Sequence, residues 1–299
     1  LQQVIQLARK VAVTDVPVLL TGETGTGKEV FAQAIHNGSA RAKQPFVAIN
    51  CSAFSKELLE SEIFGHKAGA FTGALKDKKG LFEEANHGTI FLDEIGEMAY
   101  GLQAKLLRVL ETGEYIKVGD TKPTKIDVRI VSATNRNLKE EIANSNFRED
   151  LYFRLSVFHL HLPPLRERRE DIPELAAAFL KFFAAKMGKQ VKGFAADCQA
   201  WMQSYAWPGN VRELRNVIER ALIICDDYIT LDDMPLDFRS STLSGSAADG
   251  DDFELAEAEH RHIQRVLQYT KGNKAEAARL LKIGLTTLYR KIEEYGINI

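Results

Sequence analysis

A glycine-rich run that ends in lysine is the first group of residues in the 299-residue chain that could do chemistry. It consists of Gly22, Glu23, Thr24, Gly25, Thr26, Gly27 and Lys28. It follows the strand-like sequence PVLLT and precedes a helical pattern, so its glycines would let backbone N–H groups wrap a chain of phosphates. Lys28 would reach the β- and γ-phosphates, whereas Glu29 replaces the hydroxyl residue that usually assists magnesium. The pattern predicts an ATP site, and a plain glycine-rich turn is the alternative.

A second run, TIFLDE at residues 89–94, is a buried-strand pattern that ends in two acids. Asp93 is placed to bind Mg²⁺, and Glu94 to orient and polarise an attacking water molecule. Two acids after a strand are common by chance. Together with the glycine-rich run, however, they favour an ATP hydrolase over a protein that only binds nucleotide.

The elements that would position these residues alternate between strands and helices. Five apolar runs separated by helical patterns predict an α/β fold with a parallel sheet that helices cover on both faces. These runs are PVLLTG, FVAINC, TIFLDE, DVRIVSATN and SVFHLHL. From Arg169 to about Asp227 the pattern predicts helices only, and the Ser/Gly/Asp-rich sequence RSSTLSGSAADGDD predicts a flexible linker. The predicted divisions are 1–165 (α/β), 166–238 (helical lid), 239–252 (linker) and 253–299 (small all-α domain).

Composition limits the remaining possibilities. The formal net charge of −2 argues against a protein that coats DNA along its whole length. The three cysteines lie far apart without a CxxC pair, which favours reduced thiols over a disulfide framework or a zinc site. No apolar run is long enough to cross a bilayer, and the start has no signal-peptide pattern. We therefore expect a cytoplasmic protein without a membrane partner.

The sequence GAFTGA at residues 69–74 carries a resemblance to a known family. It is the signature of sigma-54-dependent transcriptional activators, also called bacterial enhancer-binding proteins, which belong to the AAA+ class. The segments ESEIFGHKAGAFTGA, GTIFLDEIGEM, FREDLYFRL, LPPLRERREDI and WPGNVRELRN are also similar to that family's pattern. The resemblance covers almost the whole chain. It implies a P-loop AAA+ domain with a helical lid, followed by a Fis-type helix-turn-helix.

The resemblance also implies roles for single residues. Asn135 resembles sensor I, which responds to the γ-phosphate, and Asn50 resembles the residue that holds the catalytic glutamate. Arg148 and Arg154 match the arginine fingers that reach a neighbouring subunit's site, and Arg212 matches sensor II on the lid. The alternative for each arginine is a surface ion pair. Arginine fingers that act in trans imply a homo-hexameric or heptameric ring, and the family suggests a dimer when inactive.

The loop that contains GAFTGA comprises Gly69, Ala70, Phe71, Thr72, Gly73 and Ala74. Its glycines and small residues give it little intrinsic rigidity, and an apolar Phe71 on such a loop suggests that it docks on a partner. The resemblance implies that the partner is sigma-54 RNA polymerase and that the loop moves with the nucleotide state. The alternative is a loop that folds Phe71 back into its own core.

The C-terminal segment is basic, because residues 271–291 carry six basic residues against one acid. The pattern predicts two short helices joined by a turn near residues 282–284, and the resemblance implies a helix-turn-helix that binds enhancer DNA. The predicted DNA-contacting residues are Lys282, Leu285, Thr286, Thr287, Tyr289, Arg290 and Lys291. Leu285 stands where related tails often carry a polar residue, so it either contacts a thymine methyl group or packs. The alternative is a hairpin used only for dimerisation, a role that we also expect of the helix at 253–269.

Taken together, these features predict an activator that uses ATP to convert a closed promoter complex into an open one. A DNA-binding repressor of the same family and a general AAA+ remodeller are the alternatives. A basic run at Arg166, Arg168 and Arg169 predicts a contact between subunits or subdomains. Members of the family usually carry an N-terminal sensory or receiver domain, as in two-component systems. We therefore expect the chain, which begins at the first AAA+ helix, to be part of a longer protein.

Overall fold

The computed structural model describes residues 1–235, 255–270 and 272–297. The chain divides into two compact units, Leu1–Arg239 and Ser240–Ile299, which are described separately. The predicted linker at 239–252 lies outside the described residues.

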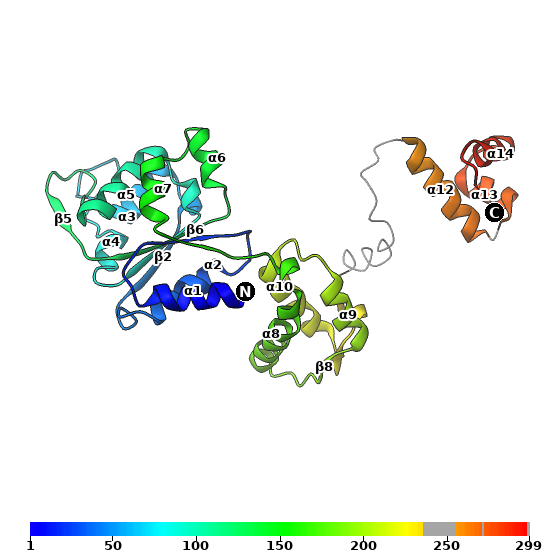
Figure 1. Ribbon diagram of the computed structural model, residues 1–299, viewed down its shortest axis with the longest axis horizontal. Coiled ribbons are helices and arrows are strands. Elements are labelled where there is room, and N and C mark those ends of the chain that lie inside the picture. The colour runs from blue at the N-terminus through cyan, green and yellow to red at the C-terminus, as the bar shows by residue number, and fades with distance from the viewer. Residues whose placement is uncertain (236–254, 271, 298–299) are drawn as a thin grey trace. The chain divides into compact units, whose positions relative to one another are not determined.

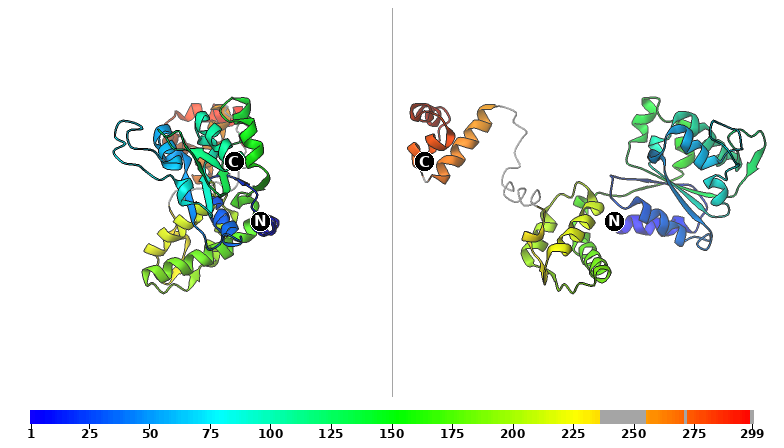
Figure 2. Two further views of the ribbon diagram at one scale, coloured as in Figure 1. Left: turned by 90° about the vertical axis from the view of Figure 1, so that its left-hand side faces the viewer. Right: turned by 180° about the vertical axis from the view of Figure 1, so that it is seen from behind.

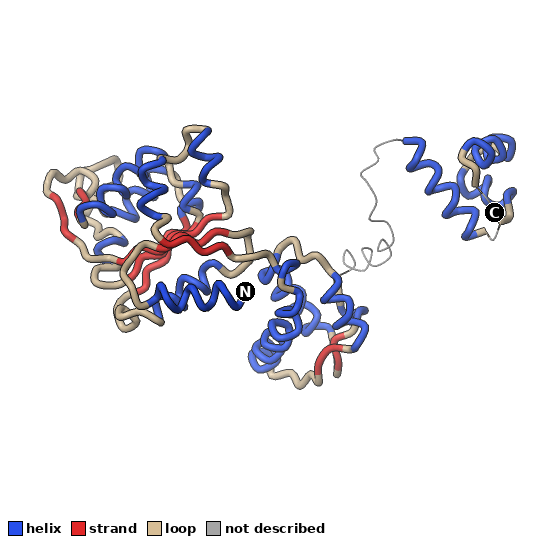
Figure 3. Tube along the Cα trace, viewed as in Figure 1, coloured by secondary structure: helices blue, strands red, loops and turns tan. Residues whose placement is uncertain are grey.

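A five-stranded parallel sheet forms the centre of the first unit, in the strand order β2-β3-β6-β1-β7 (Figures 1 and 3). Its strands are β1 (Val18–Thr21), β2 (Phe46–Asn50), β3 (Thr89–Asp93), β6 (Arg129–Thr134) and β7 (Phe158–His161). These are the five strands that the sequence predicts. The central strand β6 is buried along its whole length, as a strand covered on both faces must be.

Helices cover both faces of this sheet (Figure 1). They are α1 (Gln2–Ala12), α2 (Lys28–Asn37), α3 (Lys56–Phe64), α4 (Leu81–Glu84), α5 (Tyr100–Thr112), α6 (Leu138–Ala143) and α7 (Glu149–Leu155). Residues of α1 and α2 share one hydrophobic core with β1, β6 and β7. Residues of α3, α5 and α7 share a second core with β2 and β3. The carboxyl ends of the strands are left free to carry the site.

A small antiparallel hairpin, β4 (Glu114–Ile116) and β5 (Pro123–Lys125), was not predicted from the sequence. It lies beside the loop that contains GAFTGA, because the backbone N–H of Lys67 donates to the carbonyl of Val118 over 3.0 Å. Short 3-10 helices connect other elements: η1 (Cys51–Ala53), η2 (Ile95–Glu97), η3 (Leu165–Glu167), η4 (Arg169–Asp171) and η5 (Leu231–Asp233).

The lid follows β7 and is built mainly from α8 (Ile172–Met187), α9 (Ala196–Ser204) and α10 (Asn210–Ile224). Its core contains the buried side chains of Phe183, Trp201 and Trp207. The prediction of helices only is wrong in one detail, since β8 (Gly193–Phe194) pairs in parallel with β9 (Tyr228–Ile229). Two residues are too few to give an alternating pattern, so the sequence carries no signal for β8. Figure 2 shows the lid helices from two further sides.

The second unit contains α12 (Leu255–Tyr269), α13 (Lys274–Leu281) and α14 (Leu285–Glu294). Asn273 caps α13 by accepting a hydrogen bond from the backbone of Glu276, and Lys282 ends it in a left-handed conformation with φ 55°. The three helices pack around Ile263, Leu267 and Leu288, together with small residues of α13. Within the described residues, no helix combines the length and apolar character that a membrane span would need.

Candidate functional site

The glycine-rich run forms a P-loop between β1 and α2, as predicted. Gly22, Gly25 and Gly27 all have φ between 80° and 151°, which explains why glycine stands at these positions. Lys28 is only 7% exposed, and its ammonium donates to the carbonyl oxygens of Gly22 (2.9 Å) and Glu23 (3.3 Å). Burial lowers the pKa of Lys28, and the nearby acids of β3 act against that shift. A phosphate group placed here would meet a buried cation.

Asp93 and Glu94 stand at the carboxyl end of β3, opposite the P-loop. Glu94 adopts a left-handed backbone conformation with φ 50°, which is uncommon for a residue with a side chain. Its Oε1 lies 3.9 Å from the ammonium of Lys28, and its Oε2 accepts a hydrogen bond from the backbone N–H of Asn135 (3.2 Å). The Asn135 amide in turn donates to the hydroxyl of Thr24 over 3.1 Å. Asn135 therefore links the Glu94 carboxylate to the P-loop.

Asn50 lies at the end of β2, in register with Asp93 on the neighbouring strand. Its amide oxygen accepts hydrogen bonds from the backbone N–H (2.8 Å) and the hydroxyl (2.7 Å) of Ser52. The hydrogen bonds described for Glu94 do not include Asn50. The expected contact between Asn50 and the glutamate therefore stays a prediction, although both residues line one cavity.

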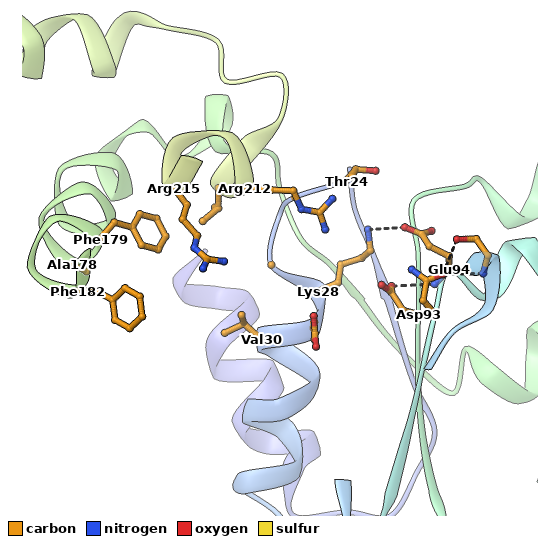
Figure 4. Close-up of a pocket in the computed structure, with 16 residues that line it drawn as sticks. Thr24, Lys28, Val30, Asp93, Glu94, Ala178, Phe179, Phe182, Arg212 and Arg215 are labelled. Carbon is orange, nitrogen blue, oxygen red and sulfur yellow. Dashed lines mark hydrogen bonds and ion pairs between the residues drawn. The ribbon is translucent and has the colours of Figure 1, made fainter. Parts of the chain in front are cut away.

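This cavity, about 710 Å³ in volume, lies between the P-loop side of the sheet and the lid (Figure 4). One wall is polar and contains Lys28, Asp93 and Glu94. The opposite wall is formed by Val30 and by lid residues: Ala178, Phe179, Phe182, Val211, Arg212 and Arg215. The charged groups of the first wall and the apolar side chains of the second, Phe179 and Phe182 among them, match a molecule that joins phosphates to a flat, apolar base.

The lid wall contains residues that sequence reasoning missed. From the sequence alone, the Phe-rich helix around Phe179–Phe183 is predicted to belong to the lid core, which holds for buried Phe183. Phe179 and Phe182 instead line the cavity, and Phe182 is 57% exposed. Arg215, one turn after Arg212 on α10, also lines it. The signal was present as helical spacing, because residues three apart share a face, but the pattern does not tell what that face meets.

The donor set at the end of β3 fits a magnesium ion. Mg²⁺ is bound by one or two carboxylates and keeps several ligands from water and phosphate, which matches Asp93 with Glu94 beside it. Glu29, in the first turn of α2, also lines the cavity. Within the described residues no group of three or more His, Cys, Asp or Glu side chains could hold a metal ion, so any metal here would depend on the phosphates.

The basic run after β7 contacts the P-loop. The guanidinium of Arg166 donates to both carboxylate oxygens of Glu23, over 2.8 and 2.5 Å. The buried guanidinium of Arg168 donates to the carbonyl of Thr26 over 3.0 Å. The predicted subdomain contact is therefore present for these two arginines.

Arg148 and Arg154 lie on α7 or at its start, and the described residues that line the 710 Å³ cavity do not include them. Arg148 forms a two-pronged ion pair with Asp150 (3.0 and 2.7 Å) and lies 5.5 Å from the centre of the Tyr100 ring. Arg154 lies 3.7 Å from Glu111. Within one chain both arginines make surface ion pairs. A role in a neighbouring subunit's site stays a prediction.

The loop at residues 69–74 leaves its aromatic side chain partly exposed. Phe71 is 46% exposed and packs edge-on against His66, with ring centres 4.9 Å apart. His66 is 9% exposed and hydrogen-bonds to the hydroxyl of Ser61 on α3 over 2.7 Å. The alternative in which Phe71 folds into the core therefore does not describe this conformation. Leu75, just after the loop, is 89% exposed and was missed by the sequence analysis.

Most of the predicted DNA-contacting residues lie on the surface of the second unit. Lys282, Leu285, Thr286, Tyr289 and Arg290 are exposed. Leu285, at 44% exposure, is available for an apolar contact with a base. Thr287 is half-buried.

Lys291 differs from these residues, because its ammonium is paired within the second unit, and its contact with DNA stays a prediction. It forms an ion pair with Glu259 of α12 over 2.6 Å, and its side chain is 17% exposed. The Tyr295 hydroxyl donates to the same carboxylate over 2.8 Å. Helical spacing placed Lys291 next to Arg290 but could not show that α12 packs against that side of α14.

Three known protein families match consecutive segments of the chain. Residues 1–161, more than half of the chain, match the family model of the sigma-54 interaction domain. The chain belongs to the sigma-54 interaction domain family. Residues 166–250 match the AAA+ ATPase lid domain, and residues 254–295 match the bacterial regulatory proteins of the Fis family. These matches confirm the resemblance and the expected combination of AAA+ domain, lid and helix-turn-helix.

Similar members of this family are transcriptional regulators by name. The regulatory protein AtoC of Escherichia coli is 45% identical over 97% of this chain and 64% of its own length. The DNA-binding transcriptional regulator NtrC of the same species is 42% identical over 100% of this chain and 69% of its own length. The chain thus spans about two thirds of these relatives.

A solved structure shares the architecture. NtrX from Brucella abortus, in complex with ADP, is 36% identical, with a TM-score of 0.76 over 99% of this chain and 68% of its own. NtrX has also been solved in complex with ATP, with a TM-score of 0.72.

Proposed function

We propose that the chain is an Mg-ATP-driven transcriptional activator that remodels sigma-54 RNA polymerase from the closed to the open promoter complex. The observation that carries the proposal is that one unit joins a complete nucleotide cavity to a loop with exposed apolar side chains. The cavity contains a buried lysine and the acids of β3, and the loop exposes Phe71 and Leu75. A helix-turn-helix in the second unit would bring the activity to DNA.

ATP would bind with its phosphates on the P-loop and its base against the apolar wall of the lid. The buried ammonium of Lys28 would hold the β- and γ-phosphates, because a buried cation gains most from an anionic partner. Mg²⁺, held by Asp93, would neutralise charge on the phosphates. Glu94 would accept a proton from the attacking water, and Asn135, bonded to both Glu94 and the P-loop, would keep the base aligned with the phosphates.

The transition state also needs a cation near the γ-phosphate. Arg212 of the lid lines the cavity of its own chain, whereas Arg148 and Arg154 do not. We infer that the last two enter the site of the next subunit, so the active form is a ring, for which the family suggests six or seven subunits. A guanidinium that acts in trans makes hydrolysis depend on assembly.

The loop would convert nucleotide state into movement through α3. That helix follows Asn50, which lines the cavity, carries Ser61 in its last turn and ends shortly before His66. His66 in turn supports Phe71 of the loop. A change at Asn50 on binding or release of the γ-phosphate could therefore reach Phe71 through one short helix, as in other two-state elements biased by γ-phosphate contacts.

Binding of labelled sigma-54 to the purified chain tests this proposal. We expect binding with a transition-state analogue of ATP hydrolysis, and at least tenfold weaker binding with ADP or without nucleotide, as for a strongly biased two-state element. Phe71→Ala and Leu75→Ala should each weaken binding. Val13→Ala, which removes a 75% exposed apolar side chain at the end of α1, should not. Binding that ignores the nucleotide, or that survives both loop substitutions, would favour a repressor or a general remodeller.

A further inference from the structure

Glu23, the second residue of the P-loop, is directed to the lid rather than to the nucleotide cavity. The described residues that line the 710 Å³ cavity do not include it. Its carboxylate accepts two hydrogen bonds from Arg166 (2.8 and 2.5 Å) and one from the amide of Asn210 (3.1 Å). The bonds from Arg166 and then Asn210 lower the pKa of Glu23 to about 2, so the carboxylate is charged at any physiological pH.

Asn210, the first residue of α10, is fully buried, and both polar atoms of its side chain form hydrogen bonds. Its amide group donates to Glu23 and to the carbonyl of Thr24 (3.1 Å), and its amide oxygen accepts from the backbone N–H of Leu165 (2.8 Å). It also adopts a left-handed conformation with φ 54°. Asparagine is one of the few residues that tolerate this conformation, and its short side chain bonds to backbone on both sides. Asn210 therefore joins the P-loop to the start of α10 and to Leu165, which precedes α8.

The backbone of α10 also rests on the P-loop. The carbonyl of Gly25 accepts hydrogen bonds from the N–H groups of Val211 (3.0 Å) and Arg212 (3.3 Å). A Cβ atom at Gly25 would collide with the backbone oxygen of Gly209, so this approach requires glycine. Arg212, whose side chain enters the cavity, is thus fixed at its backbone by the loop that would hold the phosphates.

We propose that Glu23, Arg166 and Asn210 form a clasp through which the P-loop sets the position of the lid and so of Arg212. Glu23 is then a positioning residue that acts through Arg212, not a ligand of the nucleotide. This role rests on the proposed function in that ATP is the molecule that Arg212 meets. A shift of the P-loop on phosphate binding would move the start of α10 with it.

The test measures how fast the backbone amides at the start of α10 exchange, separately from nucleotide binding. Glu23→Ala removes the acceptor for both partners, Glu23→Gln keeps one oxygen acceptor, and Arg166→Gln removes the charged donor. Arg169→Gln is the matched control, since Arg169 is an exposed arginine at the same junction for which the described residues show no ion pair. Hydrogen–deuterium exchange of a peptide covering 208–214, without added nucleotide, reports the bonds from α10 to Gly25. Steady-state kinetics report KM and kcat for ATP.

We expect exchange to be fastest in Glu23→Ala, intermediate in Glu23→Gln and unchanged in Arg169→Gln. KM for ATP should rise about fivefold in Glu23→Ala, the scale of a lost surface ion pair and one hydrogen bond. Two double variants combine Glu23→Ala with Arg166→Gln or with Arg212→Ala. Each should raise KM by less than the product of its two single fold-increases, because the effects of residues that act together are not additive.

Unchanged exchange in Glu23→Ala together with weaker ATP binding would overturn the clasp and assign Glu23 to the nucleotide. Multiplicative effects of Glu23→Ala and Arg212→Ala would overturn the link to Arg212. If the unsubstituted chain neither binds nor hydrolyses ATP, the proposed function fails, while the exchange rates measured without nucleotide still decide whether the clasp exists.

Discussion

Replacing Glu94 with glutamine should stop hydrolysis and tighten ATP binding at the same time. The Oε1 atom of Glu94 lies 3.9 Å from the ammonium of Lys28, and the two side chains are only 17% and 6% exposed. At an effective dielectric constant of about 20, this separation corresponds to a gross attraction of about 4 kcal/mol. The carboxylate therefore competes with phosphate for Lys28, and it would also repel the negatively charged nucleotide.

Glu94→Gln removes both effects while keeping the shape of the side chain. The net gain in the free energy of ATP binding is smaller, because solvent screens the attraction and the amide oxygen of glutamine still accepts a hydrogen bond. A gain of about 1–2 kcal/mol corresponds to a five- to thirtyfold lower Kd for ATP. Loss of the general base should lower kcat by about 10²- to 10⁴-fold. Titration with a fluorescent ATP analogue measures the first quantity, and release of inorganic phosphate measures the second.

The control is Glu97→Gln on η2, a carboxylate three residues away that pairs with Arg136 and is not among the described residues lining the cavity. It should change neither quantity. Weaker ATP binding in Glu94→Gln, or hydrolysis at the unsubstituted rate, would refute the assignment of Glu94 as the base beside Lys28.

Three further predictions follow from the same geometry. Chains with Arg148→Gln and chains with Glu94→Gln should each be inactive alone. An equal mixture of the two should regain about a quarter of the normal ATPase rate, because random assembly gives one intact interface in four. If the mixture does not regain activity, Arg148 does not act in trans. Burial lowers the pKa of Lys28, and a bound phosphate would raise it again. ATP binding should therefore weaken as pH rises through the lowered pKa and should take up a proton in that range, which calorimetry in two buffers measures. Binding that does not depend on pH would contradict this. Arg290→Ala should weaken DNA binding and reduce the slope of its salt dependence by about one unit. Lys291→Ala should mainly lower the melting temperature of the second unit, because it breaks the ion pair with Glu259. Equal effects of the two substitutions on DNA binding would place Lys291 at the DNA.

The sequence predicts those parts of the fold and site whose signals are local. Each strand of the main sheet is a short apolar run bounded by polar or turn residues, and the P-loop glycines stand where the structure requires positive φ. Asp93 and Glu94 could be assigned because a parallel strand places its carboxyl end at the site. Such features depend on neighbours in sequence, and therefore spacing alone identifies them.

Features that depend on packing between distant segments could not be predicted. The apolar wall of Phe179 and Phe182 exists only because the lid faces the sheet, and its residues look like core residues on a helical wheel. The ion pair of Glu23 with Arg166 could not be predicted either, because the two residues lie 143 positions apart in the chain. The ion pair of Lys291 was missed for the same reason, since only the fold of the second unit brings Glu259 of α12 to it.

Open-complex formation on a sigma-54 promoter that carries the enhancer site tests the central claim most directly, with ATP hydrolysis followed in parallel. Thr72 is exposed on the loop, so Thr72→Ala should leave folding and hydrolysis largely intact. We predict that the unsubstituted chain opens the promoter in the presence of ATP and that Thr72→Ala hydrolyses ATP without opening it. If the unsubstituted chain hydrolyses ATP and never opens the promoter, the ATPase serves another task and the account is wrong.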